Sequence, residues 1–152
     1  EVMETKFPIR LEEFSIRPDS GGPGKHRGGC GVVRRYKALE DCFGAIWFER
    51  SHTPAWGLNG GGEGAGPEVT ITRPDGEVDR LLKMRASAIT AGTVVETKTG
   101  GGGGNGDPMQ RAFADVARDV AKGYLSTEAA LRDYGVVVSS DGTVDMAAST
   151  AR

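Results

Sequence analysis

The residues that come nearest to a ligand-binding motif are glycines in the last of three glycine-rich tracts. Gly101 to Gly106 satisfy the pattern G-x-G-x-x-G between an expected strand and an expected helix, which is the setting of a dinucleotide-binding fingerprint. The tract matches through composition alone, however, and its helix leads into another helix rather than into the second parallel strand that the fingerprint needs. Nucleotide binding is therefore disfavoured. The weaker option is an anion held by backbone N–H groups ahead of Met109.

Nucleophiles and metal ligands are sparse. His26 and His52 lack the spacing of a metal-binding motif, and Cys30 and Cys42 are too few for a disulfide framework or a four-thiolate zinc site. No G-x-S-x-G elbow is present, so Ser20, which two glycines follow, is interpreted as a turn residue. The sequence therefore predicts no metal site and disfavours a self-sufficient hydrolase.

A locally basic cluster is the remaining polar candidate. Lys25, His26 and Arg27, with Arg34 and Arg35, form either a solvated face or a contact for an anion or phosphate. The whole chain does not share this character, because its formal net charge is -2 over 152 residues. A globally basic nucleic-acid-binding protein is therefore disfavoured.

The length allows one domain and little more. No run approaches the ~20 apolar residues that cross a bilayer, and the N-terminal segment lacks the apolar region of a signal peptide. We therefore predict a soluble, cytoplasmic chain without membrane contact. Because it begins with Glu1 rather than Met, we also expect a chain that is processed, trimmed or cut from something longer.

Apolar alternation predicts the strands. The segment 6–17 is extended in character, with a change of phase between Leu11 and Phe14 that indicates a bulge or bend. A Pro-Asp-Gly turn at 74–76 predicts a hairpin between EVTITR and EVDRLLKM. The other predicted strands cover 32–39, 42–49 and 93–98.

The C-terminal third is predicted to be helical. Asp107 and Pro108 at the start and Gly123 past the end favour a helix over about 108–122. Ser126 is expected to cap a second short helix that ends at Gly135, before a small hairpin. The predicted fold class is mostly β with this C-terminal helical pair (α+β).

The predicted organisation has two regions, together one domain or part of a larger subunit. Residues 1–107 form a β and glycine-rich region, and residues 108–152 form the helical pair and hairpin. The 24 glycines concentrate in tracts at 18–31, 56–67 and 99–108, which are too long for ordinary turns. Glycine allows close backbone approach and favours polyproline II-like segments, so the tracts are predicted to pack through bare backbone rather than to serve as flexible linkers. We also expect association with larger chains.

Four segments resemble motifs of the hydantoinase B family, in that family's order. They are ETKFPIR with DSGGPGKHRGGCG, then TPAWGLNGG, GGGGNGDPMQR and DVAKGYLSTEAALRDYGVVV. The resemblance covers most of this chain but only the C-terminal quarter or so of a full subunit of that family. A larger N-terminal part is therefore expected outside this chain.

The resemblance implies a β subunit that works with an ATP-hydrolysing α subunit of the actin-like kinase superfold. Members include N-methylhydantoinase, 5-oxoprolinase and the acetophenone and acetone carboxylases. In the mechanism that the resemblance implies for these enzymes, an amide or enolate oxygen is phosphorylated on the α subunit, and hydrolysis or carboxylation follows at the β subunit. The implied hetero-oligomer contains the α subunit and the remainder of the β subunit, without nucleic acid. ATP and Mg are implied on the α subunit, a divalent metal in the missing N-terminal part, and no cofactor on this chain.

The candidate site residues lie in the first and third tracts. Ser20 and Arg27 are candidates for catalytic support, and Arg27 either contacts phosphate or forms a structural salt bridge. The residues expected to bind substrate or an anion are Gly21, Gly22, Arg27, Gly28, Gly29, Gly103, Gly104 and Gly106.

The leading hypothesis is a C-terminal β-subunit segment, inactive alone, that supports hydrolytic opening of a cyclic amide. One alternative is the same role in an ATP-dependent ketone carboxylase. The others are a purely structural assembly subunit and an independent anion-binding module.

Overall fold

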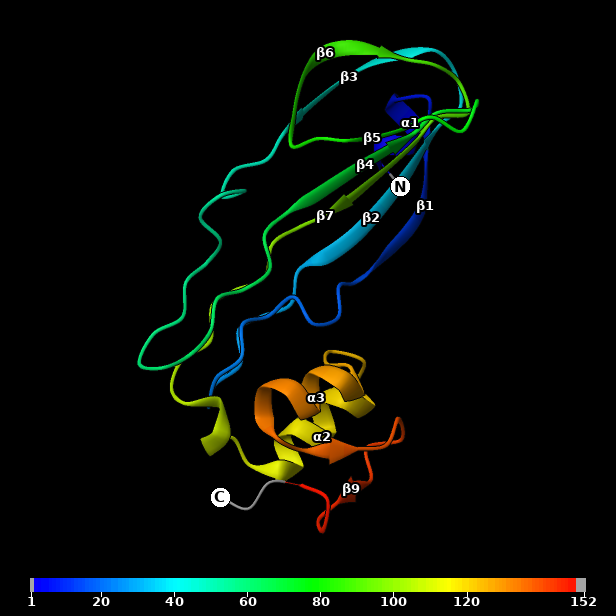
Figure 1. Cartoon of the computed structure of the whole chain (residues 1–152). Coiled ribbons are helices and arrows are strands. Elements are labelled where there is room, and N and C mark those ends of the chain that lie inside the picture. Colours follow the sequence, from blue (N-terminus) through cyan, green and yellow to red (C-terminus); the bar gives the residue numbers. More distant parts are fainter. Residues whose placement is uncertain (1, 150–152) are drawn as a thin grey trace. The chain divides into compact units, whose positions relative to one another are not determined.

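The computed structural model describes residues 2–149, which form two compact units (Figure 1). Residues 2–15, 32–51 and 67–99 form the first, here called the sheet unit. Residues 16–31, 52–66 and 100–149 form the second, here called the glycine–helix unit. Each unit is thus assembled from segments that are far apart in the sequence, and the glycine tracts belong to the same unit as the helices.

The sheet unit contains a five-stranded sheet with the strand order β1-β2-β7-β4-β5. Strand β7 pairs antiparallel with β2 and with β4, and β4 pairs antiparallel with β5. The turn between β4 and β5 places Gly76 at a φ of 90°, which confirms the predicted hairpin. The strands are β1 (Ile9–Ile16), β2 (Val32–Ala38), β4 (Glu68–Thr72), β5 (Val78–Arg80) and β7 (Val94–Lys98).

A separate antiparallel ribbon of β3 (Cys42–Trp47) and β6 (Lys83–Ile89) completes the unit, together with the short helix α1 (Val2–Lys6). The single strand predicted after the hairpin turn is wrong, because that segment contains β5 and the start of β6. Few hydrophobic side chains of this unit are buried within the described residues. They are Val33, Ala38, Val69 and Ile71.

The predicted bulge in β1 is also wrong. Burial alternates along β1 without a break, so Phe14 and Ile16 lie on the more exposed face, opposite Ile9 and Leu11. The change of phase in the sequence therefore marks apolar residues on both faces of one strand.

The glycine–helix unit carries the helical pair and the main core. Helix α3 (Thr127–Tyr134) begins at Ser126, whose hydroxyl accepts the Ala129 N–H over 3.0 Å, and ends at Gly135 with a φ of 64°. Both ends confirm the prediction. The short hairpin of β8 (Val137–Val138) and β9 (Val144–Asp145) follows. The buried core residues are Val116, Ala117, Val120, Leu125, Ala129, Ala130, Tyr134, Val136 and Val138.

The predicted helix over 108–122 begins too early. One 3-10 turn, η1 (Pro108–Gln110), is separated from α2 (Phe113–Ala121) by Arg111 and Ala112. Both have an extended backbone, with φ -72° and ψ 132° at Arg111. Asp107 caps η1 instead of a longer helix, accepting the Met109 N–H over 2.9 Å. The fold class, mostly β with a C-terminal helical pair, is confirmed. Among residues 2–149, none of the helices has the length and apolar character needed to span a bilayer.

Candidate functional site

The three glycine tracts lie side by side and bond to one another through their backbones. Between the first and third tracts, the Gly22 N–H donates to the Gly102 carbonyl over 2.8 Å. The Gly62 N–H of the second tract donates to the Pro23 carbonyl over 2.7 Å, and the Gly104 N–H donates to the Gly62 carbonyl over 2.9 Å. Each tract therefore bonds to both others. We call residues 18–31, 56–66 and 100–107 the glycine bundle.

The backbones of the glycine bundle approach too closely for side chains. A Cβ atom on Gly28 would overlap the Gly102 carbonyl, and one on Gly103 would overlap the Trp56 carbonyl. Only glycine allows such an approach. The predicted packing through bare backbone is confirmed, and the bonded bundle contradicts the flexible-linker alternative.

The glycines predicted to bind an anion belong to this bundle. The N–H groups of Gly22, Gly28, Gly104 and Gly106 each donate to a backbone carbonyl, so these four are engaged in holding the bundle together. Gly29 differs, because a Cβ there would meet nothing within 4 Å. Anion or substrate binding by the predicted glycines stays a prediction.

Ser20 is fixed by its own hydroxyl. Only 1% of the residue is exposed, and its Oγ donates to the Arg17 carbonyl over 2.6 Å while accepting the Gly31 N–H over 2.8 Å. The hydroxyl proton and an oxygen lone pair are thus both in use. This arrangement fits a residue that fixes the start of the first tract better than it fits a nucleophile.

Replacing Ser20 with alanine is expected to lower the free energy of unfolding by about 1–3 kcal/mol, because the buried Gly31 N–H loses its acceptor. Turnover of an enzyme complex containing the variant is expected to persist wherever the variant stays folded. Denaturant unfolding and a steady-state assay measure the two effects. Ser87→Ala, which removes an exposed bond to the Arg85 carbonyl, is the control, with an expected change below about 0.5 kcal/mol. Loss of turnover in folded Ser20→Ala would contradict the structural role.

Arg27 forms a buried ionic cluster with two residues that follow the third tract. Its Nε donates to Oδ2 of Asp119 in α2 over 3.0 Å, and Nη2 of Arg111 donates to the same oxygen over 2.8 Å. The side chains of Arg27, Asp119 and Arg111 are 13%, 7% and 11% exposed. One carboxylate is therefore shared by two guanidinium groups, and the three residues form what we call the ionic cluster.

The surroundings keep Arg27 charged and tie it to the bundle. Burial alone lowers the pKa of Arg27, but the hydrogen bond and charge of Asp119 outweigh it, so the pKa is raised above its ordinary value. Nη1 donates to the Gly28 carbonyl over 2.6 Å and to Sγ of Cys30 over 3.2 Å, and the guanidinium lies 5.4 Å from the ring centroid of Tyr124. Of the two roles predicted for Arg27, the geometry shows the salt bridge. A phosphate contact stays a prediction.

Asp19 provides a second connection between the first tract and the helices. Its carboxylate accepts the Ser126 N–H over 2.7 Å, and its own N–H donates to the Tyr124 carbonyl over 3.1 Å. Asp19 has a φ of 57°, a left-handed conformation that Asp adopts more readily than most residues. Asp19 therefore connects the glycine bundle to the start of α3, whereas the ionic cluster connects it to α2.

Sequence reasoning missed Arg111 and Asp119 as partners of Arg27. Asp119 lies 92 residues from Arg27, and nothing in a local pattern joins them. A signal was present, because each of the three is a charged residue of a quoted motif: Arg27 in DSGGPGKHRGGCG, Arg111 at the end of GGGGNGDPMQR and Asp119 at the start of DVAKG. Three separate motifs therefore meet in one cluster.

The other polar candidates have separate surroundings. Lys25 and His26 are exposed in the bundle, whereas Arg35 belongs to the sheet unit and pairs with Glu13 over 2.8 Å. Within residues 2–149, no three His, Cys, Asp or Glu side chains gather as a metal site would require.

A family model described as hydantoinase B/oxoprolinase matches residues 1–108. The chain belongs to this family. The match takes in all the strands of the sheet unit and the glycine bundle, so it confirms the suspected family and contains the first two quoted motifs and most of the third, whereas the motif that begins at Asp119 lies beyond it.

Relatives of this hydantoinase B/oxoprolinase chain extend the similarity through the helices. An uncharacterized protein of Methanocaldococcus jannaschii is 40% identical over 96% of this chain and 26% of its own length. The caprolactamase subunit beta of Pseudomonas jessenii is 32% identical over 99% of this chain and 27% of its own length.

Two solved structures have the same fold over nearly the whole chain. The ATP-dependent caprolactamase from Pseudomonas jessenii matches with a TM-score of 0.83 and 27% identity, over 97% of this chain and 26% of that one. A nucleotide-free acetone carboxylase matches with a TM-score of 0.77 and 26% identity, over 93% of this chain and 24% of that one. The chain spans about a quarter of the length of these relatives.

Proposed function

We propose that the chain is the C-terminal segment of the β subunit of an ATP-dependent hydantoinase/oxoprolinase-type complex. In this proposal it supports hydrolytic opening of a cyclic amide that is activated by phosphorylation on an α subunit of the actin-like kinase superfold. The similarity to an ATP-dependent caprolactamase over 97% of the chain carries the proposal. Caprolactam is a cyclic amide, so this relative favours ring opening over carboxylation.

The proposed chemistry overcomes the low reactivity of an amide carbonyl. Transfer of the γ-phosphoryl group of ATP to the amide oxygen makes the carbonyl carbon electrophilic and prepares the oxygen to leave as phosphate. Water then adds to that carbon, the ring nitrogen departs, and hydrolysis of the resulting acyl phosphate releases phosphate. The activated amide must be kept from water until it reaches the hydrolytic site, because premature hydrolysis would waste ATP.

The glycine bundle is suited to form a dry wall in such a complex. The N–H groups of Gly22 and Gly104 donate to carbonyls of neighbouring tracts, and a Cβ at Gly28 would overlap the Gly102 carbonyl, so no space is left between tracts at those positions. We assign ATP and Mg to the α subunit and any divalent metal to the part of the β subunit outside this chain. This chain contributes positioning, through the bundle and the ionic cluster.

Purification of the native complex, followed by ATPase assays, tests the proposal. We expect ADP formation that depends on a cyclic amide such as caprolactam, hydantoin or 5-oxoproline, together with the ring-opened carboxylic acid. A 152-residue chain that hydrolyses these amides without any partner would contradict the proposal. A complex whose rate of ADP formation is the same with and without each of the three amides would contradict it as well.

Ketone carboxylation is the second candidate function. The TM-score of 0.77 with acetone carboxylase over 93% of this chain favours it. The same complex would then form ADP in the presence of acetone or acetophenone with bicarbonate, and cyclic amides would have no effect. Running both substrate sets on one preparation decides between the two candidates.

Arg27→Ala distinguishes catalytic support from a purely structural assembly role. The variant loses the bonds from Arg27 to Asp119 and to the Gly28 carbonyl, so within the ionic cluster the first tract is then held only by the bond from Arg111 to the Lys25 carbonyl. We expect turnover per assembled complex to fall roughly tenfold or more, the scale of loss that small misplacement of a site produces. Subunit content by size exclusion separates assembly from turnover. Unchanged turnover per assembled complex would support the purely structural alternative.

A further inference from the structure

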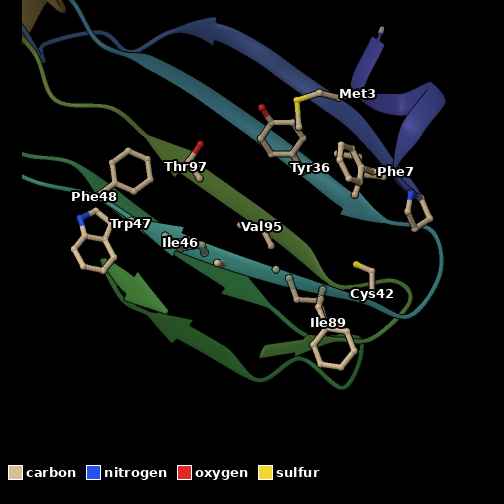
Figure 2. A pocket seen from close by; sticks show the side chains of 15 residues that line it. Met3, Phe7, Tyr36, Cys42, Ile46, Trp47, Phe48, Ile89, Val95 and Thr97 are labelled. Atoms are coloured by element: carbon tan, nitrogen blue, oxygen red, sulfur yellow. The ribbon is translucent and has the colours of Figure 1, made fainter. Parts of the chain in front are cut away.

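An apolar groove in the sheet unit is a feature that the proposed function leaves unused. Its volume is about 510 Å³, and it lies between one face of the five-stranded sheet and the β3–β6 ribbon. Figure 2 shows Tyr36 and Val95 on the sheet and Cys42 and Ile46 on β3 around it. None of the lining side chains is charged. The groove therefore suits an apolar occupant and not a nucleotide or a phosphorylated intermediate.

The groove gathers aromatic side chains to an unusual degree. Five of the ten aromatic residues of the chain line it, and three of them remain strongly exposed: Phe43 at 80%, Trp47 at 72% and Phe7 at 56%. Aromatic residues and Met are enriched at the centres of protein interfaces, where burial of each contributes most to binding. A monomeric soluble protein rarely leaves so many of them in one exposed patch.

The openness of the groove argues against a small-molecule site. Pockets for small ligands enclose roughly 70–90% of the ligand surface. Here Phe43, Trp47 and Phe7 line the groove while more than half of each stays in contact with solvent, so its walls do not close over a ligand. Within the described residues, β3 and β6 pair only with each other, which leaves an outer backbone edge on each strand that an extended segment can use.

We propose that this groove holds an apolar segment of the remaining polypeptide of the β subunit. This inference rests on the proposed function, because it treats the chain as one segment of such a subunit. The relatives that match nearly all of this chain are about four times as long, so about three quarters of such a subunit lies outside it. In such a subunit, that polypeptide is covalently linked to the sheet unit. Its effective concentration at the groove is therefore higher than that of any separate partner.

Photo-crosslinking in the native complex tests the groove. The probe p-benzoylphenylalanine replaces Phe43, whose 80% exposure means that the exchange disturbs little packing, and a second preparation carries it at Trp47. Phe14 is the matched control, since it is 62% exposed on β1 and does not line the groove. Cross-linked peptides are identified by mass spectrometry.

We expect cross-links from Phe43 and Trp47 to peptides that align with the relatives outside the stretch matched by this chain. The probe at Phe14 is expected to form no cross-link to those peptides. Cross-links from the groove to a second copy of this chain or to an α subunit would overturn the inference. No product from either groove position, or the same peptide captured equally from Phe14, would overturn it as well.

The outcome is separable from that of the proposed function. Amide-dependent ADP formation without the cross-link overturns only the docking inference. The cross-link in a complex that forms no ADP with either substrate set overturns only the proposed function.

Discussion

Replacing Asp119 with asparagine is expected to lower the free energy of unfolding of the glycine–helix unit by about 3–5 kcal/mol, the usual result of removing one partner from a buried ion pair. The Asp119 carboxylate accepts hydrogen bonds from Arg27 and Arg111, and no more than 13% of any of the three side chains is exposed. The variant leaves two buried guanidinium groups facing a neutral amide. Denaturant unfolding followed by circular dichroism measures the change.

Asp115→Asn is the matched control on the same helix. Asp115 pairs with Arg118 one turn away, but their side chains are 39% and 56% exposed, and such exposed helix pairs contribute only about 0.3–0.5 kcal/mol. Both substitutions remove one negative charge from α2, so they change the net charge of the helix by the same amount. Equal destabilisation by the two variants would show that the ionic cluster has no special importance.

The ionic cluster explains how family motifs that are distant in sequence act as one structural unit. Arg27 belongs to the bundle, Asp119 to α2, and Arg111 to the connection between them. Arg111 also donates to the Lys25 carbonyl over 3.0 Å, so each arginine bonds to the first tract as well as to Asp119. The helices therefore hold the first tract through charged side chains, whereas the tracts hold each other through backbone.

The elements that were predicted correctly depend on short-range signals. Ser126 and Gly135 mark the two ends of α3 through a cap bond and a left-handed residue, and both act within a few positions of the chain. The hairpin around Gly76 is similar, because its turn residues lie between the two strands that they join. The family motifs could also be recognised from the sequence, because the residues of each motif are consecutive in the chain.

The elements that were predicted wrongly depend on distant contacts. Arg111 adopts an extended backbone that ends η1. In this position its side chain bonds to Asp119, a contact that no local sequence pattern indicates. Phe14 and Ile16 occupy the exposed face of β1, where alternation alone suggested a bulge. The meeting of Arg27 with Asp119 has the same origin, because 92 residues separate the two. Local propensity cannot report a contact that tertiary structure alone creates.

The glycine tracts are an intermediate case. Their composition correctly predicted close backbone packing, because only glycine permits it, but it gave no order of pairing between tracts. Which residue meets which follows from the bonds of Gly22 to Gly102 and of Gly62 to Pro23. Polyproline II character within the tracts stays a prediction.

Replacing Gly28 with alanine is expected to prevent the glycine bundle from closing. The added Cβ would overlap the Gly102 carbonyl, and backbone atoms cannot rotate away as a side chain can. Overpacking of a core costs about 1–3 kcal/mol and occasionally more, and we expect a loss at or above roughly 3 kcal/mol here because both partners are main chain. Hydrogen exchange of the Gly22 and Gly102 N–H groups, which bond across the first and third tracts, reports the opening directly.

Gly29→Ala provides a control at the adjacent position. A Cβ at Gly29 meets nothing within 4 Å, and its φ does not lie in the left-handed region, so alanine fits there without strain. Such a replacement changes stability by less than about 1 kcal/mol, in the stabilising direction, because it restricts the unfolded chain. The two variants differ by one position and by the presence or absence of facing backbone. Similar hydrogen exchange in both would mean that the tracts are not pressed together in solution, and the dry wall assigned to them would lose its basis.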